Sequence, residues 1–301
     1  MLETATLVGR PYAGPADLAA MQALLRVGRR LADSTTNWSP GELEWGIVTD
    51  VPATDLSERV TLWSLAGRAD DRPIAWTWWT PPDELDWFVE PTIDGPGIRA
   101  AILDRLEQPI RTIWTTTAHT AVIDLLAERG YERDGDGYLH FARSLDAADD
   151  PPLRLPDGFS VRAVELPRDL EERVRVHRAA FAPSKMTVEK HARVAGMPGY
   201  RPDFDLVAVA PDGTFASFCI AWLDDETGIV EFEPVGTDPA FARRGLASAV
   251  MNTAMTRAAA LGAGVALVTS RGGEKGIRGT SLYRSLGFRQ VRETVPFRRP
   301  A

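Results

Sequence analysis

The stretch GTDPAFARRGLASAV, residues 236–250, carries the most information about the fold of this chain. A Thr-Asp-Pro turn leads through two arginines and Gly245 into a helix of small residues. The first turn of a helix leaves several backbone N–H groups without intrahelical partners, at the positive end of the helix dipole. Gly245 and Ala247 have little or no side chain, so a ligand can approach these N–H groups closely. Arg243 and Arg244 add positive charge. The stretch predicts an anion site, with the opening of an ordinary packed helix as the alternative.

The segments around this stretch alternate between strand and helix patterns. Strands are predicted at 159–164, 204–210, 214–223, 229–237, 265–270 and 290–297, and helices at 169–181, 187–196, 246–261 and 279–288. Asp169 is the expected N-cap of the first of these helices. An apolar stripe on the third consists of Leu246, Val250, Ala254, Ala258 and Leu261. The pattern predicts an α/β domain with a mixed sheet.

The first half of the chain repeats this layout. Arg10 and Asp17 have the spacing of Arg162 and Asp169, and Gly130 in LLAERGYERD corresponds to Gly287 in LYRSLGFRQV. Anchors this far apart at nearly one offset indicate a duplicated domain. The segment between them is rich in Asp and Pro, which break helices and strands. We therefore predict one domain over 1–145, a linker over 146–157 and a second domain over 158–301.

Composition narrows the class of protein. The 301 residues carry a net charge of −8, which argues against a general nucleic-acid binder. From Pro239 onward, however, eleven Arg or Lys face two acids, which indicates either a local anionic ligand or a solvated basic face. The apolar runs are too short to span a membrane and no secretory signal is visible, so we expect a cytoplasmic protein. A single cysteine, Cys219, is expected to be a buried strand residue.

The residues before and after the opening stretch resemble one known family. The strand IVEFEPVGT, then ARRGLA, then a long helix, is similar to the acyl-CoA pyrophosphate loop Q/R-x-x-G-x-G/A of the GNAT superfamily of N-acyltransferases. Gly245 and Ala247 fit the pattern, and Ala242 departs from its first position. The downstream segment LYRSLGF is similar to a second GNAT feature, whose tyrosine lies beside the cofactor sulfur. The resemblance implies two tandem GNAT-like domains, of which the C-terminal one binds acetyl-CoA.

The resemblance also implies roles for individual residues. Tyr283 would protonate the departing thiolate, and the alternative is a packed aromatic residue on a short helix. Glu231 matches the glutamate that serves as base in some GNAT members, and Glu233 lies nearer the expected cleft. Either glutamate could instead bind a cationic substrate or face solvent. The residues that would bind the cofactor are Val235, Gly236, Thr237, Arg243, Arg244, Gly245, Leu246, Ala247 and Ser248.

The first half lacks these motifs. Leu126 stands where Tyr283 would pair, and TIDGPGIRAAIL does not match the loop pattern, so we expect this half to have lost cofactor binding. It holds eight of the nine tryptophans, including WTWW at 76–79, which could line a substrate cleft or divide between core and interface. In the second half, Ser184 and Lys185 are candidates for acceptor contacts or ordinary loop residues.

The sequence therefore predicts an N-acetyltransferase that transfers an acetyl group from acetyl-CoA to a primary amine by direct attack. The acceptor is expected to be a small molecule or a peptide, and a homodimer is one option for the oligomeric state. The histidines, His119, His140, His177 and His191, are scattered, so no metal site is expected. Two alternatives are a noncatalytic acyl-CoA-binding sensor or assembly module, and a mycothiol-synthase-like transferase, which shares the tandem plan.

Overall fold

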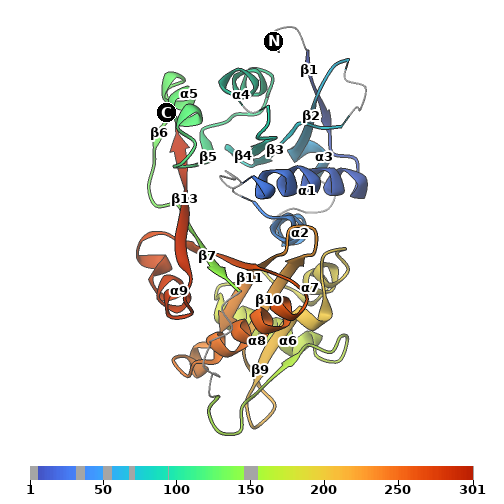
Figure 1. Ribbon diagram of the computed structural model, residues 1–301, viewed down its shortest axis with the longest axis vertical. Coiled ribbons are helices and arrows are strands. Elements are labelled where there is room, and N and C mark those ends of the chain that lie inside the picture. The colour runs from blue at the N-terminus through green and yellow to red at the C-terminus, as the bar shows by residue number, and fades with distance from the viewer. Residues whose placement is uncertain are drawn as a thin grey trace.

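The computed structural model describes residues 6–31, 38–49, 56–67, 72–93, 95–145 and 155–300. Helices lie on both faces of its strands, and two similar bodies follow one another along the long axis (Figure 1). The first body contains β1 (Leu7–Pro11), α1 (Pro15–Arg30), α2 (Pro40–Thr49), α3 (Leu56–Arg59), β2 (Val60–Leu65), β3 (Ala75–Thr80), β4 (Glu84–Val89), α4 (Pro96–Leu103), β5 (Thr112–Thr116), α5 (Thr120–Glu128) and β6 (Glu132–Arg133). The second contains β8 (Ser160–Ala163), α6 (Leu170–Ala180), α7 (Val188–Ala195), β9 (Asp205–Val209), β10 (Phe215–Asp224), β11 (Ile229–Thr237), α8 (Leu246–Ala260), β12 (Val265–Arg271) and α9 (Gly273–Ser285).

Two further strands join the bodies, β7 (Tyr138–Ser144) and β13 (Arg289–Arg298). The strands that the structure describes form one sheet in the order β1-β2-β3-β4-β5-β13-β7-β12-β11-β10-β9-β8, with β6 beside β13. This order is symmetric about the pair β7 and β13. In each half four antiparallel strands lead to one parallel pair, β4 with β5 and β11 with β12. The predicted α/β fold with a mixed sheet and a repeated layout is confirmed.

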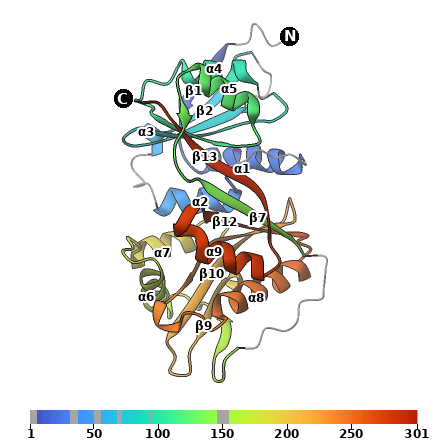
Figure 2. The ribbon, with the colours of Figure 1, turned by 90° about the vertical axis from the view of Figure 1, so that its left-hand side faces the viewer.

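The two halves exchange their last strands. β7, which ends the first half, lies antiparallel to β12 of the second half, and β13, which ends the second half, lies antiparallel to β5 of the first. β7 and β13 also pair with each other, and they run side by side between the two bodies (Figure 2). Each half of the sheet is thus completed by a strand from the other half.

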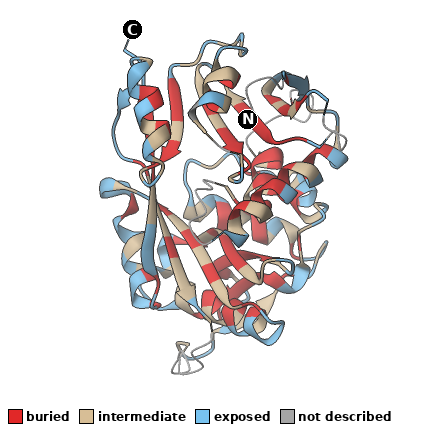
Figure 3. Ribbon diagram, turned by 45° about the horizontal axis from the view of Figure 1, so that its top comes forward, coloured by how far each residue is buried: buried red, intermediate tan, exposed pale blue. Residues whose placement is uncertain are grey.

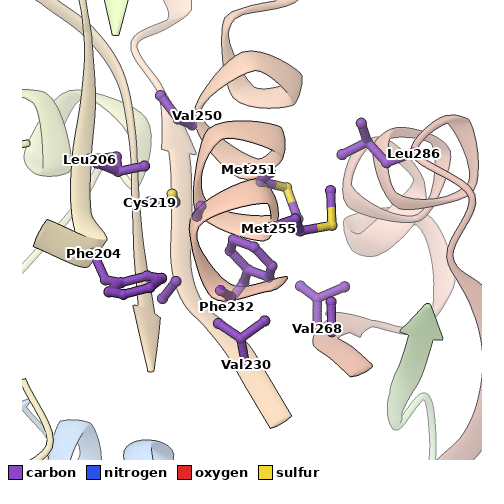
Figure 4. Close-up of a cluster of buried hydrophobic side chains, with 14 of the residues drawn as sticks. Phe204, Leu206, Cys219, Val230, Phe232, Val250, Met251, Met255, Val268 and Leu286 are labelled. Atoms are coloured by element: carbon purple, nitrogen blue, oxygen red, sulfur yellow. The ribbon is translucent and has the colours of Figure 1, made fainter. Parts of the chain in front are cut away.

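The exchange extends into the hydrophobic cores. Phe141 of β7 is fully buried in the core of the second half, among the residues under α8 and α9. Val295 and Phe297 of β13 belong to the core of the first half, under α4 and α5. Figure 3 shows the buried residues concentrated along the sheet and on the helix faces toward it. Side chains of β10, β11 and α8 interdigitate in the second-half core, and Cys219 is buried there as predicted (Figure 4).

The duplication is visible in matching side-chain contacts. Arg10 pairs with Asp17 at 2.6 Å, and Arg162 pairs with Asp169 in the same way. Each aspartate also accepts a hydrogen bond from the backbone N–H four residues earlier, at 2.7 Å and 2.8 Å. This contact ties the end of the first strand of each half to the helix that follows it.

Two local predictions are wrong and a third holds in position only. Leu261, expected on the buried stripe of α8, is 54% exposed because α8 ends at Ala260 and the chain turns there. Asp169 is the N-cap residue of α6 as predicted, but its side chain bonds two arginines and the Glu165 N–H rather than a helix N–H. The second-half helix expected to begin at residue 279 begins at Gly273.

Most of the predicted linker lies outside the described residues, and the domain boundaries stay a prediction. The strand exchange shows in addition that strand pairing crosses these boundaries. Within the described ranges, no helix combines the length and the apolar character that crossing a membrane requires.

Candidate active site

A wedge opens between the two parallel strands of the second half. β11 and β12 pair from Ile229 with Val265 to Phe232 with Val268, and the pairing ends there. Beyond this point β11 continues to Thr237 and β12 to Arg271, and residues of both strands line a common cavity. The backbone of Val235, Gly236 and Thr237 therefore has no ladder partner in β12.

A β-bulge marks the start of the wedge. The register of β10 against β11 shifts between Cys219 and Ala221, where β11 contains one residue more than β10. The indole N–H of Trp222 donates to the carbonyl oxygen of Glu233 at 2.7 Å. This bond satisfies a backbone acceptor that the bulge takes out of the hydrogen-bond ladder. Bulges bend a strand and redirect its side chains. The bulge falls at Glu233 and Pro234, whereas Glu231 remains in register with Trp222.

The predicted pantetheine segment is held firmly against β10. A Cβ on Gly236 would lie 2.7 Å from the Phe218 ring and 2.8 Å from Ala180, so only glycine fits. The Ser217 hydroxyl donates to the Gly236 carbonyl at 2.8 Å and lies 2.9 Å from the Thr237 hydroxyl. Val235 lines the cavity.

The predicted phosphate turn precedes α8 with an open backbone. Arg243 and Gly245 both adopt left-handed conformations, with φ of 63° and 76°. Residues 242–245 are exposed, whereas Leu246 is buried in the core and anchors the helix. Ala247 and Ser248 are half-buried in its first turn. The Arg244 guanidinium lies over the rings of Phe159 and Phe241, at 6.0 Å and 5.6 Å from their centroids.

Tyr283 lies on α9, on the far side of the wedge. Its ring packs against Phe141 and Phe288, at 5.9 Å and 6.2 Å between centroids, and it lines the cavity. Burial raises the pKa of its hydroxyl, and the charge of Glu233 raises it further. The group is therefore protonated at neutral pH, as a proton donor must be.

Glycines let α9 approach β12. A Cβ at Gly276 would overlap the Arg271 carbonyl oxygen, and one at Gly279 would lie 2.9 Å from the Ser270 hydroxyl. The glycine-rich segment that was expected to be a loop is therefore a helix whose small residues permit close packing. This packing sets the position of Tyr283 relative to the wedge.

The cavity of about 770 Å³ is shared by both halves. The second half contributes Glu233, Pro234, Val235, Thr269, Ser270, Arg271, Lys275, Gly276, Gly279 and Tyr283, with Phe181 from the end of α6 and Thr294 from β13. The first half contributes Trp38, Glu42, Trp45, Gly46, Trp78, Thr80, Glu84, Asp86 and Trp114, with Tyr138 and His140 from the exchanged strand β7. Its volume lies within the roughly 300–1,000 Å³ typical of small-molecule sites.

The three acidic residues at the wedge have different surroundings. Glu231 is buried beside Arg29 of α1, at 3.3 Å, and lines a separate cavity of about 150 Å³ rather than the larger one. Burial raises the pKa of Glu231, and Arg29 opposes this shift. Glu42 of α2 lies close to both glutamates of β11. Burial raises its pKa well above the usual range, and the charges of Glu231 and Glu233 raise it further.

The tryptophans of the first half were candidates for a substrate cleft, but Glu42, Tyr138 and His140 were not identified from the sequence. Glu42 has no local motif, and its place in the site depends on the packing of α2 against β10, β11 and α7. His140 lies on β7 with its Nε2 at 2.7 Å from the Thr294 hydroxyl, and burial lowers its pKa to about 4, so the ring is neutral. The alternation of Tyr138 and His140 indicated a strand with both on one face, but not which sheet it joins.

The other candidates divide between two locations. Trp78 lines the cavity while Trp76 is fully buried in the core of the first half, so WTWW serves both as core and as cavity wall. The Ser184 hydroxyl accepts a hydrogen bond from the Met186 N–H at 3.2 Å, and neither Ser184 nor Lys185 lines the cavity. Among the residues described, no three His, Cys, Asp or Glu side chains gather as a metal site would require.

The equivalent wedge of the first half is filled differently. β4 and β5 pair only at Glu84 with Thr112 and Leu85 with Ile113. The helix after this wedge, α4, has 8 residues against 15 in α8, and Arg99 in it is buried 4.5 Å from the Trp87 ring centroid. Leu126, at the position equivalent to Tyr283, is fully buried. These side chains occupy the space around the first-half wedge.

Residues 171–288 match the sequence profile of the Acetyltransferase (GNAT) family. The second half is a GNAT acetyltransferase domain. The match covers α6 to α9 and so includes the wedge, the turn before α8 and Tyr283.

Solved structures extend the GNAT fold to the whole chain. The GCN5-related N-acetyltransferase from Sphaerobacter thermophilus is 20% identical with a TM-score of 0.62, covering 98% of this chain and 96% of its own. The tandem GNAT protein from the clavulanic acid biosynthesis pathway is 12% identical with a TM-score of 0.62, covering 97% and 98%. The GNAT-family acetyltransferase from Colwellia psychrerythraea is 10% identical with a TM-score of 0.64, covering 97% and 100%. No curated protein sequence matches the chain.

Proposed function

We propose that the protein transfers an acetyl group from acetyl-CoA to a primary amine in the cavity between its two halves. The observation that carries the proposal is the wedge between β11 and β12, with Glu233 on one side and Tyr283 on the other, facing one cavity. Support also comes from the GNAT family match of the same segment.

The residues present fit acetyl-CoA. Arg243, Arg244 and the first N–H groups of α8 would hold the pyrophosphate, because the turn exposes its backbone and bears two cations. The free side of Val235, Gly236 and Thr237 would hold the pantetheine arm and polarise the thioester carbonyl. When bound, acetyl-CoA supplies an activated acetyl group and a thiolate leaving group.

Two side chains move the protons. Glu233 accepts a proton from the ammonium group, because an amine attacks only in its neutral form. As the C–N bond forms and the C–S bond breaks, Tyr283 donates a proton to the leaving sulfur. The new amide nitrogen releases its second proton, and Tyr283 regains one from solvent, so one proton is released per turnover. Glu42 lines the same cavity, and its raised pKa favours the protonated form, whereas Glu231 is paired with Arg29.

Binding and turnover can be tested separately. We expect acetyl-CoA to bind in calorimetry and thiol to be released when an amine is added. Replacing both Arg243 and Arg244 with Ala should weaken acetyl-CoA binding by about tenfold or more, since charge-assisted contacts contribute roughly 1.5–3 kcal/mol each. Arg284→Ala, at an exposed position on α9, is the matched control. Binding without thiol release across a broad amine panel would identify a noncatalytic acyl-CoA sensor instead.

A further inference from the structure

Aromatic rings form a wall of the cavity. Trp38 stacks on Trp78 with 5.3 Å between centroids, and Trp114 lies 5.4 Å from Tyr138. Trp45 and Phe181 complete this wall. All except Phe181 come from the first half or its exchanged strand. The outer faces and edges of these packed rings favour a flat apolar guest, which can stack on them or meet them edge-on.

Several carboxyl groups line the same cavity as the aromatic rings. Asp86, Glu42 and Glu233 all belong to its lining together with Tyr138. Burial raises the pKa of the Tyr138 hydroxyl, Arg271 opposes the shift, and the three acids raise it further. Asp86 is fixed in place by the Trp38 indole N–H, which donates to it at 3.2 Å. Glu84 lines the same cavity.

Acidic side chains outnumber cationic ones in the lining of the cavity. The acids are Glu42, Glu84, Asp86 and Glu233, and the cations are Arg271, which lies over the Tyr138 ring at 5.7 Å, and Lys275 on the first turn of α9. His140 is neutral at physiological pH because of its burial. Even with Glu42 protonated, as its raised pKa favours, the acids remain in excess, which favours a cationic ligand.

We propose that the acceptor is an arylalkyl primary amine, whose ring packs against the tryptophans and whose ammonium group lies beside Asp86 and Glu233. This assignment rests on the proposed acetyl transfer and adds the class of amine. The aromatic lining favours an amine with a flat apolar ring over an aliphatic polyamine or an amino sugar, whose surfaces are flexible or largely polar.

The test compares amines that differ in one feature. 2-Phenylethylamine, hexylamine, spermidine and glucosamine are assayed with acetyl-CoA by thiol release. We expect kcat/KM for 2-phenylethylamine to exceed that for hexylamine by about tenfold, since one aromatic contact contributes about 0.5–1.5 kcal/mol and the wall offers several. In Trp114→Leu, the ratio of kcat/KM for 2-phenylethylamine to kcat/KM for hexylamine should fall by about tenfold, through a change in KM. Turnover of hexylamine should change by less than about twofold.

A tryptophan outside the cavity serves as control. Trp79 neighbours Trp78 in the sequence but its indole N–H donates to the Pro109 carbonyl at 3.3 Å, away from the cavity. Trp79→Leu should keep the preference for the aryl amine. If Trp114→Leu does not fold, Trp38→Leu replaces it. Equal use of hexylamine and 2-phenylethylamine, or equal effects of Trp114→Leu and Trp79→Leu, would overturn the assignment.

The two proposals fail in different ways. Acetylation of spermidine or glucosamine without acetylation of 2-phenylethylamine supports acetyl transfer and rejects the arylalkyl acceptor. Absence of thiol release with every amine rejects acetyl transfer. In that case quenching of tryptophan fluorescence by 2-phenylethylamine, lost in Trp114→Leu, still supports an aryl-amine pocket, and absence of quenching rejects it as well.

Discussion

At the scale of the residue, Tyr283 connects the core of the second half to its cavity. Its ring packs between Phe141 and Phe288, and its hydroxyl is held protonated by burial and by Glu233. A packed aromatic residue and a proton donor were the two interpretations that the sequence left open. The ring contacts and the cavity position agree with both at once, because the ring fixes the hydroxyl in place.

Tyr283→Phe separates these two roles. The phenylalanine ring keeps both aromatic contacts, so we expect the melting temperature and acetyl-CoA affinity to stay close to those of the wild type. Turnover should fall by roughly 10²- to 10⁴-fold, the range of a general acid. Stopped-flow thiol release and calorimetry measure the two effects. Tyr131→Phe in the first half, whose hydroxyl bonds the Ile110 carbonyl, is the control. Parallel losses of affinity and turnover would contradict the proton-donor role.

His177 provides a residue-scale prediction for acid stability. It stacks on Phe218 at 5.4 Å, and its Nδ1 has no hydrogen-bond partner in the part of the chain that the structure describes. Burial lowers its pKa to about 3, with help from Arg173 and His191 and against Asp205. In the unfolded chain the pKa of this histidine is about 6.5. Below that pH the imidazole is protonated in the unfolded state but stays neutral in the folded state. Stability is therefore complete above pH 6.5 and falls as the pH drops toward 3.

His177→Phe should reduce this acid dependence. A phenyl ring preserves the stacking, so the free energy of unfolding should fall less steeply below pH 6.5, by up to about 1.4 kcal/mol per pH unit. Urea titrations at a series of pH values measure the slope. His119→Gln, at the start of α5, should leave it unchanged. An identical slope in His177→Phe and the wild type would exclude the proposed titration.

At the scale of the element, the packing of α9 on β12 decides where Tyr283 lies. Gly276 leaves no room for a Cβ because the Arg271 carbonyl fills that space. Gly276→Ala should displace α9, lower the free energy of unfolding by roughly 1–3 kcal/mol and reduce turnover. Gly97→Ala, in α4 with open space around it, should raise stability by about 0.5–1 kcal/mol. Chemical denaturation of both variants tests the contrast, and an unperturbed Gly276→Ala would disprove the close packing.

Most elements of the second half follow from local pattern. The strand 229–237 and the helix that starts at Leu246 lie where predicted, because alternation, apolar spacing and the turn at Asp238 are all local signals. The start of α9 was missed because glycine has a low helix propensity, and only contact with β12 explains Gly276 and Gly279. Propensity describes an isolated segment, whereas this helix depends on tertiary packing.

At the scale of the whole molecule, the exchange of β7 and β13 makes the halves interdependent. Phe297 of β13 lies in the core of the first half, although it belongs to the end of the second. Phe297→Ala should cost about 3–5 kcal/mol and increase hydrogen exchange in β5, which pairs with β13. Val291→Ala, on the same strand but 59% exposed, is the matched control with little expected effect. Increased exchange confined to β9 and β10 would contradict the exchanged core.

The composite cavity could not be predicted from the sequence for the same reason. Layout revealed two similar halves, and Glu233 and Tyr283 were identified from motifs in the second. Trp114, Tyr138 and Glu42 belong to the first half and reach the cavity only through the strand exchange and the packing of α2. No local pattern encodes which sheet a last strand joins.

The exchange also sets an order for synthesis. β5 leaves the ribosome long before β13. The edge of β5 that pairs with β13 therefore stays unpaired while nearly all of the second half is translated. Domains commonly fold in N-terminal order as they are made, and unpaired edges promote association with other chains. Here the first half cannot finish early, because its missing strand is encoded last. A nascent chain arrested before residue 289 lacks β13, so it should bind chaperones more strongly than a chain whose first half is complete. The two halves should therefore reach their final structure at the same time.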